Sequence, residues 1–252
     1  MAIRTVLITQ ARMGSTRLPG KVLMEVNNTP LLKIHLDRLS KAKNVDKIIV
    51  ATTIKGEDDI IEKIVSEWGY EVFRGSENDV LDRFYNAVKD INPEWIVRVT
   101  SDCPLIDPIL VDKVIKVTQS ENKDYGSNAI DETFPDGQDV EVFTFIALSK
   151  AWNEATKLSE REHVTPYIKN NSDLKNGQIF SAINLRNNID YSRIRITVDE
   201  KKDFELMEKI IKELGLNKNW LEYTECIIKN RFFEINSDIV RNEGYLKSLK
   251  KD

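Results

Sequence analysis

The amino-acid sequence predicts an α/β protein built on a doubly wound, mostly parallel, Rossmann-like sheet. In residues 1–120, short apolar runs alternate with amphipathic helical patterns, which favours parallel strands joined by right-handed helical crossovers. The apolar runs are almost continuous, as is typical of strands that helices cover on both faces. A loop rich in cations and glycine follows the first run, and open α/β sheets bind ligands just beyond the carboxyl ends of their strands.

Four strands and four helices are expected in this first part. The strands are expected at residues 6–8, 47–52, 70–73 and 95–100. The helices are expected at residues 30–41, 57–68, 80–88 and 108–117, where apolar side chains recur at helical spacing.

Beyond residue 120 the pattern is less regular. It predicts strands at residues 140–145, 179–184 and 194–198, and helices at residues 148–155, 162–169, 204–214 and 220–228. The polar residues 247–252 are expected to fray. The length suits one domain over residues 1–252, and we place its internal divisions near residues 120 and 204.

Composition restricts the class of protein and of partner. The net charge of −4 argues against nucleic acid as the main partner. Cys103 and Cys226 are the only cysteines and lack metal-site spacing, which favours reduced thiols and a cytoplasmic protein. No apolar run approaches the roughly 20 residues that a membrane-spanning helix needs, so no membrane partner is expected.

Residues 10–21 carry three cations, Arg12, Arg17 and Lys21, between small residues. Glycine lets backbone N–H groups approach phosphate oxygens, while guanidinium and ammonium groups neutralise them. The loop is not a Walker P-loop, because five residues instead of four separate its glycines and a valine replaces the magnesium-binding Ser or Thr. The loop therefore favours a small polyanion, although a surface turn with scattered charges is the alternative.

Four stretches resemble one enzyme family. They are QARMGSTRLPGK at residues 10–21, TSDCPLID at 100–107, DGQDVEVF at 136–143 and EREHVTPY at 160–167. They resemble the cytidylyltransferases that make CMP-activated sugars, a family that includes the CMP-Kdo and CMP-acylneuraminate synthetases. The spore coat polysaccharide type matches best, and the resemblance extends to about residue 204.

The resemblance implies a nucleotide-diphospho-sugar transferase fold of the GT-A type. Residues 1–120 would then bind nucleotide, residues 121–204 would bind the acceptor, and residues 205–252 would form C-terminal helices. The implied reaction transfers CMP from CTP to a sugar, such as a 2-keto-3-deoxy sugar acid or related polysaccharide precursor, and releases pyrophosphate. The candidate nucleotide-binding residues are Gln10, Ala11, Arg12, Met13, Gly14, Ser15, Arg17, Lys21, Arg74 and Ser76.

Two aspartates are candidate ligands of Mg²⁺. Asp102 follows a predicted strand, and Mg²⁺ is usually held by one or two carboxylates together with substrate phosphates. Helix capping is the alternative for Asp102, but Asp107 already fills that place. The resemblance implies Asp199 as the second ligand, and capping of the following helix is its alternative. We expect Arg12, Lys21 and Asp102 to be the catalytic residues, acting through electrostatic stabilisation.

Three residues are candidates for acceptor binding. Asp139 and Glu141 alternate with valines, so a strand would send both carboxylates to one face, toward sugar hydroxyls or toward solvent. His163 lies among charged residues and could bind an acidic sugar or transfer a proton. His35 is interpreted as a histidine at the edge of the core. Arg83 is either a base-reading group or a solvated surface charge.

Three other functions fit part of the sequence. They are nucleotidyl transfer to a sugar 1-phosphate or another phosphorylated acceptor, a GT-A glycosyltransferase, and a nucleotide-binding domain without turnover. The glycosyltransferase is disfavoured because no Asp-x-Asp pair follows the predicted strand at 95–100. A homodimer is a further possibility, because the aromatic residues Phe143, Phe145, Trp152 and Phe180 suit either a core or a dimer face.

Overall fold

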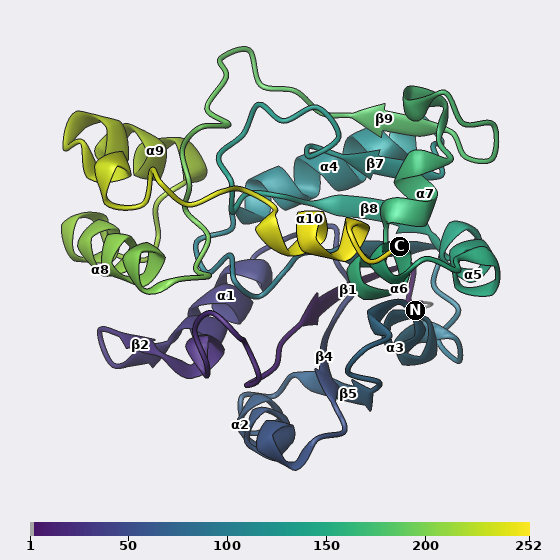
Figure 1. The fold of residues 1–252 in the computed structure, drawn as a ribbon, viewed down its shortest axis with the longest axis horizontal. Coiled ribbons are helices and arrows are strands. Elements are labelled where there is room, and N and C mark those ends of the chain that lie inside the picture. Colours follow the sequence, from purple (N-terminus) through teal and green to yellow (C-terminus); the bar gives the residue numbers. More distant parts are fainter. Residues whose placement is uncertain (1–2) are drawn as a thin grey trace.

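The computed structural model describes residues 3–252 and contains a seven-stranded sheet (Figure 1). The strand order is β5-β4-β1-β6-β8-β7-β9. The strands are β1 (Thr5–Gln10), β4 (Lys47–Thr53), β5 (Glu71–Gly75), β6 (Trp95–Arg98), β7 (Tyr125–Ser127), β8 (Glu141–Thr144) and β9 (Ala182–Asn184). A separate two-stranded ribbon pairs β2 (Glu25–Val26) with β3 (Thr29–Pro30).

The sheet is mainly parallel, and its strand order reverses beside β1. The pairs β5–β4, β4–β1, β1–β6 and β7–β9 are parallel, while β8 runs antiparallel to β6 and β7. The chain moves outward from β1 to β4 and β5, and then returns to place β6 on the other side of β1. Such a switch point opens a crevice between the carboxyl ends of the two strands, and it decides where a ligand can bind.

Helices cover both faces of the sheet. The helices are α1 (Leu31–Leu39), α2 (Asp59–Glu67), α3 (Val80–Val88), α4 (Pro108–Ser120), α5 (Phe145–Glu154), α6 (Leu158–His163), α7 (Pro166–Asn170), α8 (Lys201–Leu214), α9 (Trp220–Lys229) and α10 (Glu243–Leu249). Short 3-10 turns are η1 (Lys21–Leu23), η2 (Gly56–Asp58), η3 (Asp173–Lys175) and η4 (Phe232–Ile235). Helices α1, α2 and α4 pack on one face, and α3, α5 and α7 pack on the other.

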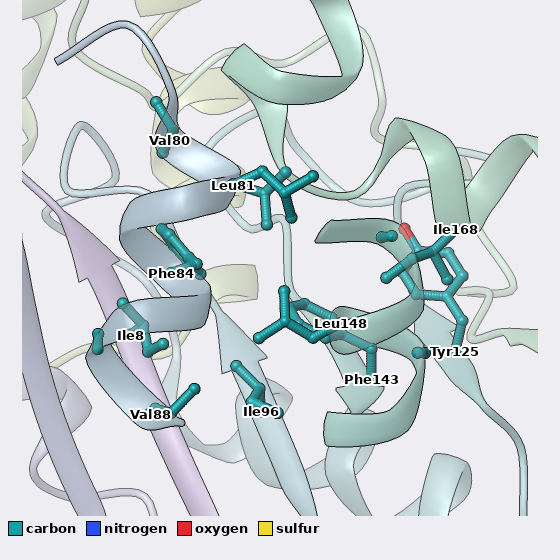
Figure 2. Packing of buried hydrophobic residues seen from close by; sticks show 14 of the residues in the cluster. Ile8, Val80, Leu81, Phe84, Val88, Ile96, Tyr125, Phe143, Leu148 and Ile168 are labelled. Carbon is teal, nitrogen blue, oxygen red and sulfur yellow. The ribbon is translucent and has the colours of Figure 1, made fainter. Parts of the chain in front are cut away.

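The core follows the alternation of side chains along each strand. Leu7 packs on the α4 side, whereas Ile8 packs on the α3 side. Figure 2 shows Leu81 and Phe84 of α3 directed toward Ile96 of β6 and Leu148 of α5. Because α3 is locked by this packing, its amino-terminal end is held at the carboxyl edge of the sheet.

Several predicted elements differ from the structure in length or in kind. The strand predicted at 140–145 is shorter, because the Thr144 hydroxyl accepts a hydrogen bond from Ala147 N (3.1 Å) and starts α5. The helix predicted at 162–169 is two helices, α6 and α7, which separate at Val164, where φ is +73°. The three-residue strand β7 was not predicted, since it is too short to show a period.

The strand predicted at 194–198 is wrong. This segment is buried and extended, but only Arg195 forms a bridge, with Asp136. The segment that contains Asp136 turns away from it at Gly137, where φ is +105° and an added Cβ would lie 2.7 Å from Thr197 N. Val198 N then donates to Asp102 O (2.7 Å), so the segment connects to the end of β6 instead of extending the sheet.

The C-terminal residues are ordered, which corrects the expectation that 247–252 fray. Residues 247–249 belong to α10, and the Asp252 carboxylate accepts hydrogen bonds from Ser159 N (2.8 Å) and Ser159 Oγ (2.6 Å). In Figure 1, α10 (yellow) crosses in front of the sheet toward α6. The C-terminus therefore lies beside the crevice and not away from it.

Residues 3–252 include no helix that is both long enough and apolar enough to cross a membrane. Of the aromatic residues considered for a dimer face, Phe143 and Phe180 are buried in the core. The homodimer stays a prediction.

Candidate active site

A cavity of about 660 Å³ opens at the carboxyl ends of β1 and β6, at the switch point of the sheet. Six parts of the chain supply its walls: the basic loop after β1, the start of α3, the end of β6, and the segments within residues 129–169, 195–199 and 242–251. The cavity therefore brings together residues from nearly the whole length of the sequence, since Gln10 and Lys251 both line it.

The basic loop is held rigidly before it reaches the cavity. Gly20 N donates to Met13 O (2.9 Å) and closes the loop, and Gly20 has a φ of +70°. Met13 N donates to the Asp58 carboxylate (2.7 Å), which ties the loop to η2. Lys21 follows directly in η1, so its side chain has a defined direction.

Three charged side chains meet at the centre of the cavity. The Lys21 ammonium donates to Asp199 Oδ1 (2.8 Å), to Asp102 Oδ2 (3.3 Å) and to Val198 O (2.8 Å). Burial alone would lower the pKa of Lys21, but the two carboxylates outweigh burial and raise it. Burial would raise the pKa of Asp102, yet Lys21 and hydrogen bonds from neighbouring side chains lower it to about 2. Both groups are therefore charged at neutral pH.

The other two loop cations differ in how far they are already paired. The Arg17 guanidinium lies 3.0 Å from Asp199 Oδ2 and 3.5 Å from Glu243 Oε2. Arg12 lies 3.4 Å from Glu77 and its side chain is 42% exposed. Arg12 thus keeps the most hydrogen-bonding capacity for a ligand in the cavity.

The carboxylates of Asp102 and Asp199 are suitable ligands for Mg²⁺. Their carboxylates approach the same ammonium group, so they face one small volume. Asp107 caps α4 by accepting from Ile109 N (2.8 Å), and Glu200 holds the N-cap position of α8, so neither candidate ligand is needed as a cap. Residues 3–252 contain no group of three or more His, Cys, Asp or Glu that could hold a metal by themselves. Two carboxylates completed by phosphate oxygens are the usual magnesium arrangement.

The candidate nucleotide-binding residues fall into two groups. Six line the cavity: Gln10, Ala11, Arg12, Ser15, Arg17 and Lys21. Met13 and Gly14 belong to the same loop but not to the lining. Arg74 and Ser76 also lie outside the lining; the Arg74 guanidinium donates to Thr53 O (2.9 Å) and Lys55 O (2.9 Å) instead. A base-reading role for Arg74 and Ser76 stays a prediction that the geometry does not support.

Arg83 is the cation that lines the cavity from α3. The prediction of a solvated surface charge was wrong, because Arg83 is only 2% exposed and donates to Ser76 O (2.9 Å). Among residues 3–252 its Nε has no hydrogen-bond partner. Burial and the nearby Arg12 charge lower the pKa of Arg83 to about 10. Its helical spacing from Val80 and Ala87 is the sequence signal that places it on the buried face.

In the half of the chain predicted to bind the acceptor, Glu141 holds a partly buried hydrogen-bond network. Its carboxylate accepts from Arg98 Nη1 (2.5 Å), Tyr125 Oη (2.6 Å) and Thr165 Oγ1 (2.6 Å). Burial would raise the pKa of Glu141, but Arg98 and the two hydroxyl groups lower it. Sequence reasoning missed Arg98, although a cation inside the apolar run 95–99 is a visible signal.

Asp139 also faces the cavity, and Arg241 pairs with it at 2.9 Å and 3.1 Å. Burial raises the pKa of Asp139, and the Arg241 charge opposes that effect. Behind them, Arg195 donates to Asp136 Oδ2 (2.6 Å), Asp199 Oδ2 (3.0 Å) and Asp203 Oδ1 (2.9 Å). Arg195 therefore links Asp136, which lines the cavity, to Asp199 at its centre.

His163 lines the cavity and is neutral at pH 7. Burial and the Arg98 charge lower its pKa to about 4, and its Nε2 lies 3.1 Å from Ser248 Oγ. His35 lies deeper than the core edge expected for it, because it is fully buried between Thr9 Oγ1 (3.0 Å) and Cys103 O (2.9 Å).

Comparison with known proteins decides the family. The cytidylyltransferase family profile matches residues 6–239. The chain belongs to the cytidylyltransferase family. Among relatives of this cytidylyltransferase is an uncharacterized protein of Methanocaldococcus jannaschii, 43% identical over 242 residues that cover 94% of this chain and 96% of the relative. The spore coat polysaccharide biosynthesis protein SpsF of Bacillus subtilis is 36% identical, covering 82% of this chain and 86% of SpsF.

Relatives that act on sugars and solved structures agree with this family. The 3-deoxy-manno-octulosonate cytidylyltransferase of Bartonella tribocorum is 30% identical, covering 66% of this chain and 70% of that enzyme. A cytidylyltransferase structure from Leptospira borgpetersenii has a TM-score of 0.85 at 33% identity, covering 96% of this chain and all of that one. A CMP-2-keto-3-deoxy-manno-octonic acid synthetase complexed with CTP (TM-score 0.62, 15% identity, covering 83% and 99%) shares the fold. The cytidylyltransferase is thus of the CMP-sugar type.

Proposed function

We propose that this cytidylyltransferase transfers CMP from CTP to a sugar acid and releases pyrophosphate, in a reaction that depends on Mg²⁺. The observation that carries the proposal is the meeting of Lys21, Asp102 and Asp199 in one cavity at the switch point of the sheet. In the reaction, an acceptor hydroxyl oxygen bonds to the α-phosphorus, the bond from that phosphorus to the bridging oxygen breaks, and the hydroxyl proton is lost.

The loop cations would bind the triphosphate. Lys21 and Arg17 neutralise Asp199 in the free chain, and phosphate oxygens carried in with a cation can replace that pairing without leaving a charge unpaired. Arg12 would then hold the outer phosphates, because its guanidinium has only a 3.4 Å contact with Glu77 and its side chain is 42% exposed. Such groups stabilise the charge of a phosphoryl-transfer transition state by position alone.

Asp102 and Asp199 would hold the Mg²⁺ ion. When bound, the ion would neutralise the α-phosphate and lower the pKa of the attacking hydroxyl. Among residues 3–252 no side chain in the cavity is a clear general base, since a pKa of about 4 makes His163 a weak proton acceptor and its Nε2 already contacts Ser248 Oγ. Lys21 helps to hold the pKa of Asp102 low, so that carboxylate is charged when the ion binds.

Gln10 would select cytosine. Gln10 lines the cavity, and its side-chain Oε1 is buried and has no hydrogen-bond partner among residues 3–252. An unpaired buried acceptor is costly, and the exocyclic amino group of cytosine is a donor that would satisfy it. Uracil presents a carbonyl oxygen at that position, so UTP would leave Gln10 Oε1 unsatisfied.

The acceptor proposal rests on relatives and on charge. The relatives include the 3-deoxy-manno-octulosonate cytidylyltransferase named above, and a further one from Shewanella frigidimarina that is named for the 8-amino-3,8-dideoxy form. Arg98 places a buried cation on the acceptor side, with a donor at Nε that has no partner among residues 3–252. A carboxylate on the acceptor would suit that donor.

Turnover tests the proposal. The protein is incubated with each of the four NTPs, Mg²⁺ and a panel of acceptors: 3-deoxy-manno-octulosonate, its 8-amino-3,8-dideoxy form, N-acetylneuraminate and a sugar 1-phosphate. We expect pyrophosphate release with CTP and one sugar acid, and a CMP-linked product of the matching mass. Product from the sugar 1-phosphate alone, or equal use of UTP, would contradict the proposal.

A further inference from the structure

The last residues of the chain form a wall of the cavity that the family profile does not cover. The profile ends at residue 239. We call residues 241–252 the C-terminal wall. Its cavity-lining residues are Asn242, Glu243, Gly244, Tyr245, Lys247 and Lys251. The segment therefore completes the site while it lies outside the residues that the family profile matches.

The C-terminal wall is fixed at three points along its length. Arg241 pairs with Asp139 at its start. Ser248 Oγ lies between Glu162 Oε2 (2.6 Å) and His163 Nε2 (3.1 Å) in the middle. At the end, Asp252 accepts two hydrogen bonds from Ser159. These contacts give the segment a defined position although it contains only one short helix.

These three anchors belong to the acceptor side of the cavity. Asp139, Ser159 and His163 all lie in residues 121–204, while Glu243 contacts the basic loop, at 3.5 Å from Arg17. Tyr245 packs edge-on against His163, with ring centroids 5.2 Å apart and planes at 82°. Its ring is thus held at the acceptor side by the same histidine that lines the cavity.

We propose that the C-terminal wall selects the acceptor sugar, an inference that rests on the proposed function. Tyr245 packs along the carbon chain of the acceptor, since an aromatic ring offers a large contact area with little entropy to lose. Lys247 and Lys251 attract the acceptor carboxylate. Both lysines are near the surface, so their effect is electrostatic attraction that salt screens.

Point variants test the wall with the sugar acid that gives most product in the panel above. We expect Tyr245→Ala to raise the acceptor KM by about tenfold, and Tyr245→Phe to keep it near the wild-type value, because ring contact supplies the effect. The double change Lys247→Ala with Lys251→Ala should raise the acceptor KM roughly threefold at low salt and less at high salt. Lys250→Ala, outside the lining, is the matched control.

The KM for CTP and the melting temperature separate acceptor selection from a structural role. Selection predicts that both stay near wild-type values while the acceptor KM rises. A truncation after Arg241 keeps the ion pair between Arg241 and Asp139. The rate of the truncated protein should no longer saturate with acceptor concentration, although the protein still binds CTP. If the truncated chain does not fold, the point variants decide.

Two outcomes would overturn the inference, and they differ from failure of the proposed function. An unchanged acceptor KM in Tyr245→Ala and in the double lysine variant would remove the inference alone. A parallel rise of both KM values with a lower melting temperature would show a structural role only. If the wild-type protein releases no pyrophosphate with any sugar acid, the proposed function fails and the inference falls with it.

Discussion

On the nucleotide side of the cavity, as proposed, one continuous loop supplies the three cations, and the acids that they meet come from four other segments, at Glu77, Asp102, Asp199 and Glu243. On the acceptor side, the charged groups come from many segments and are mostly paired with one another, as Glu141 is with Arg98 and Asp139 with Arg241. Under the proposed function, the first arrangement would exchange its ion pairs for those of the ligand. The second keeps its ion pairs and presents a preformed surface, so the two sides should respond differently to substitution.

The largest effect is expected at Lys21. We expect Lys21→Met to lower kcat/KM for CTP by roughly 10²–10³-fold, as the loss of one charged donor does in a site that excludes water. Pyrophosphate release measured against CTP concentration checks this. Lys63→Met, on the exposed face of α2, is the control and should stay at the wild-type value. If Lys21→Met changed only the KM for the acceptor, the contrast between the two sides would be wrong.

Arg98 is the matching test on the acceptor side. Hydrogen bonds to charged groups contribute about 1.5–3 kcal/mol, so Arg98→Met should raise the acceptor KM by roughly 10–100-fold. The KM for CTP should change little, because Arg98 pairs with Glu141 and with no residue of the basic loop. The exposed Arg193→Met is the control. An equal rise in both KM values would show that the two sides are not separable.

Arg74 and Arg83 are two cations on the nucleotide side that should differ in their effect on CTP binding. Arg83→Met should raise the KM for CTP about tenfold, since a buried cation with a free donor lines the cavity. Arg74→Met should leave that KM within about twofold, because its guanidinium is engaged outside the cavity and such exposed ion pairs contribute little. Steady-state kinetics at saturating acceptor compare them. The reverse order would restore Arg74 as the base-reading residue.

His163 should produce the smallest catalytic effect. With a pKa of about 4 it stays neutral, so the acceptor KM of wild type and His163→Gln should run parallel from pH 8 to pH 5.5. A step near pH 6.5 that only the wild type shows would contradict this.

The lowered pKa of His163 also makes the stability of the protein depend on pH. The unfolded histidine, near pKa 6.5, binds a proton before the folded one does, so the free energy of unfolding should fall as pH drops from 6.5 to 4. The fall should be at most about 3 kcal/mol for this group, and smaller in His163→Gln. His35, also lowered to about 4, adds its own contribution in both proteins. Denaturant titrations at pH 7, 5.5 and 4.5 measure this.

The fold and the nucleotide side were predictable because their signals are local. Each parallel strand is a short apolar run, and the loop at residues 10–21 carries its chemistry in consecutive residues. The mainly parallel sheet and the family are confirmed. Asp102 and Asp199 could be paired before the structure only through the family resemblance, because 97 positions (199 − 102) separate them.

The acceptor side was less predictable because its order comes from long-range contacts. Residues 194–198 have the alternation of a strand, but the turn at Gly137 removes the partner that a ladder needs. Arg241 and Tyr245 lie beyond the last predicted helix, at 220–228, and their positions depend on contacts with distant residues such as Asp139 and His163. Pairing of this kind leaves no period in the sequence.

The dependence of CTP binding on Mg²⁺ tests the central claim most directly, since it asks whether Asp102 and Asp199 hold the ion that the triphosphate brings. Calorimetry should show that Mg²⁺ tightens CTP binding to the wild-type protein by at least about tenfold, which is about 1.4 kcal/mol. In Asp102→Asn with Asp199→Asn that gain should disappear. Equal tightening by Mg²⁺ in both proteins would contradict the account.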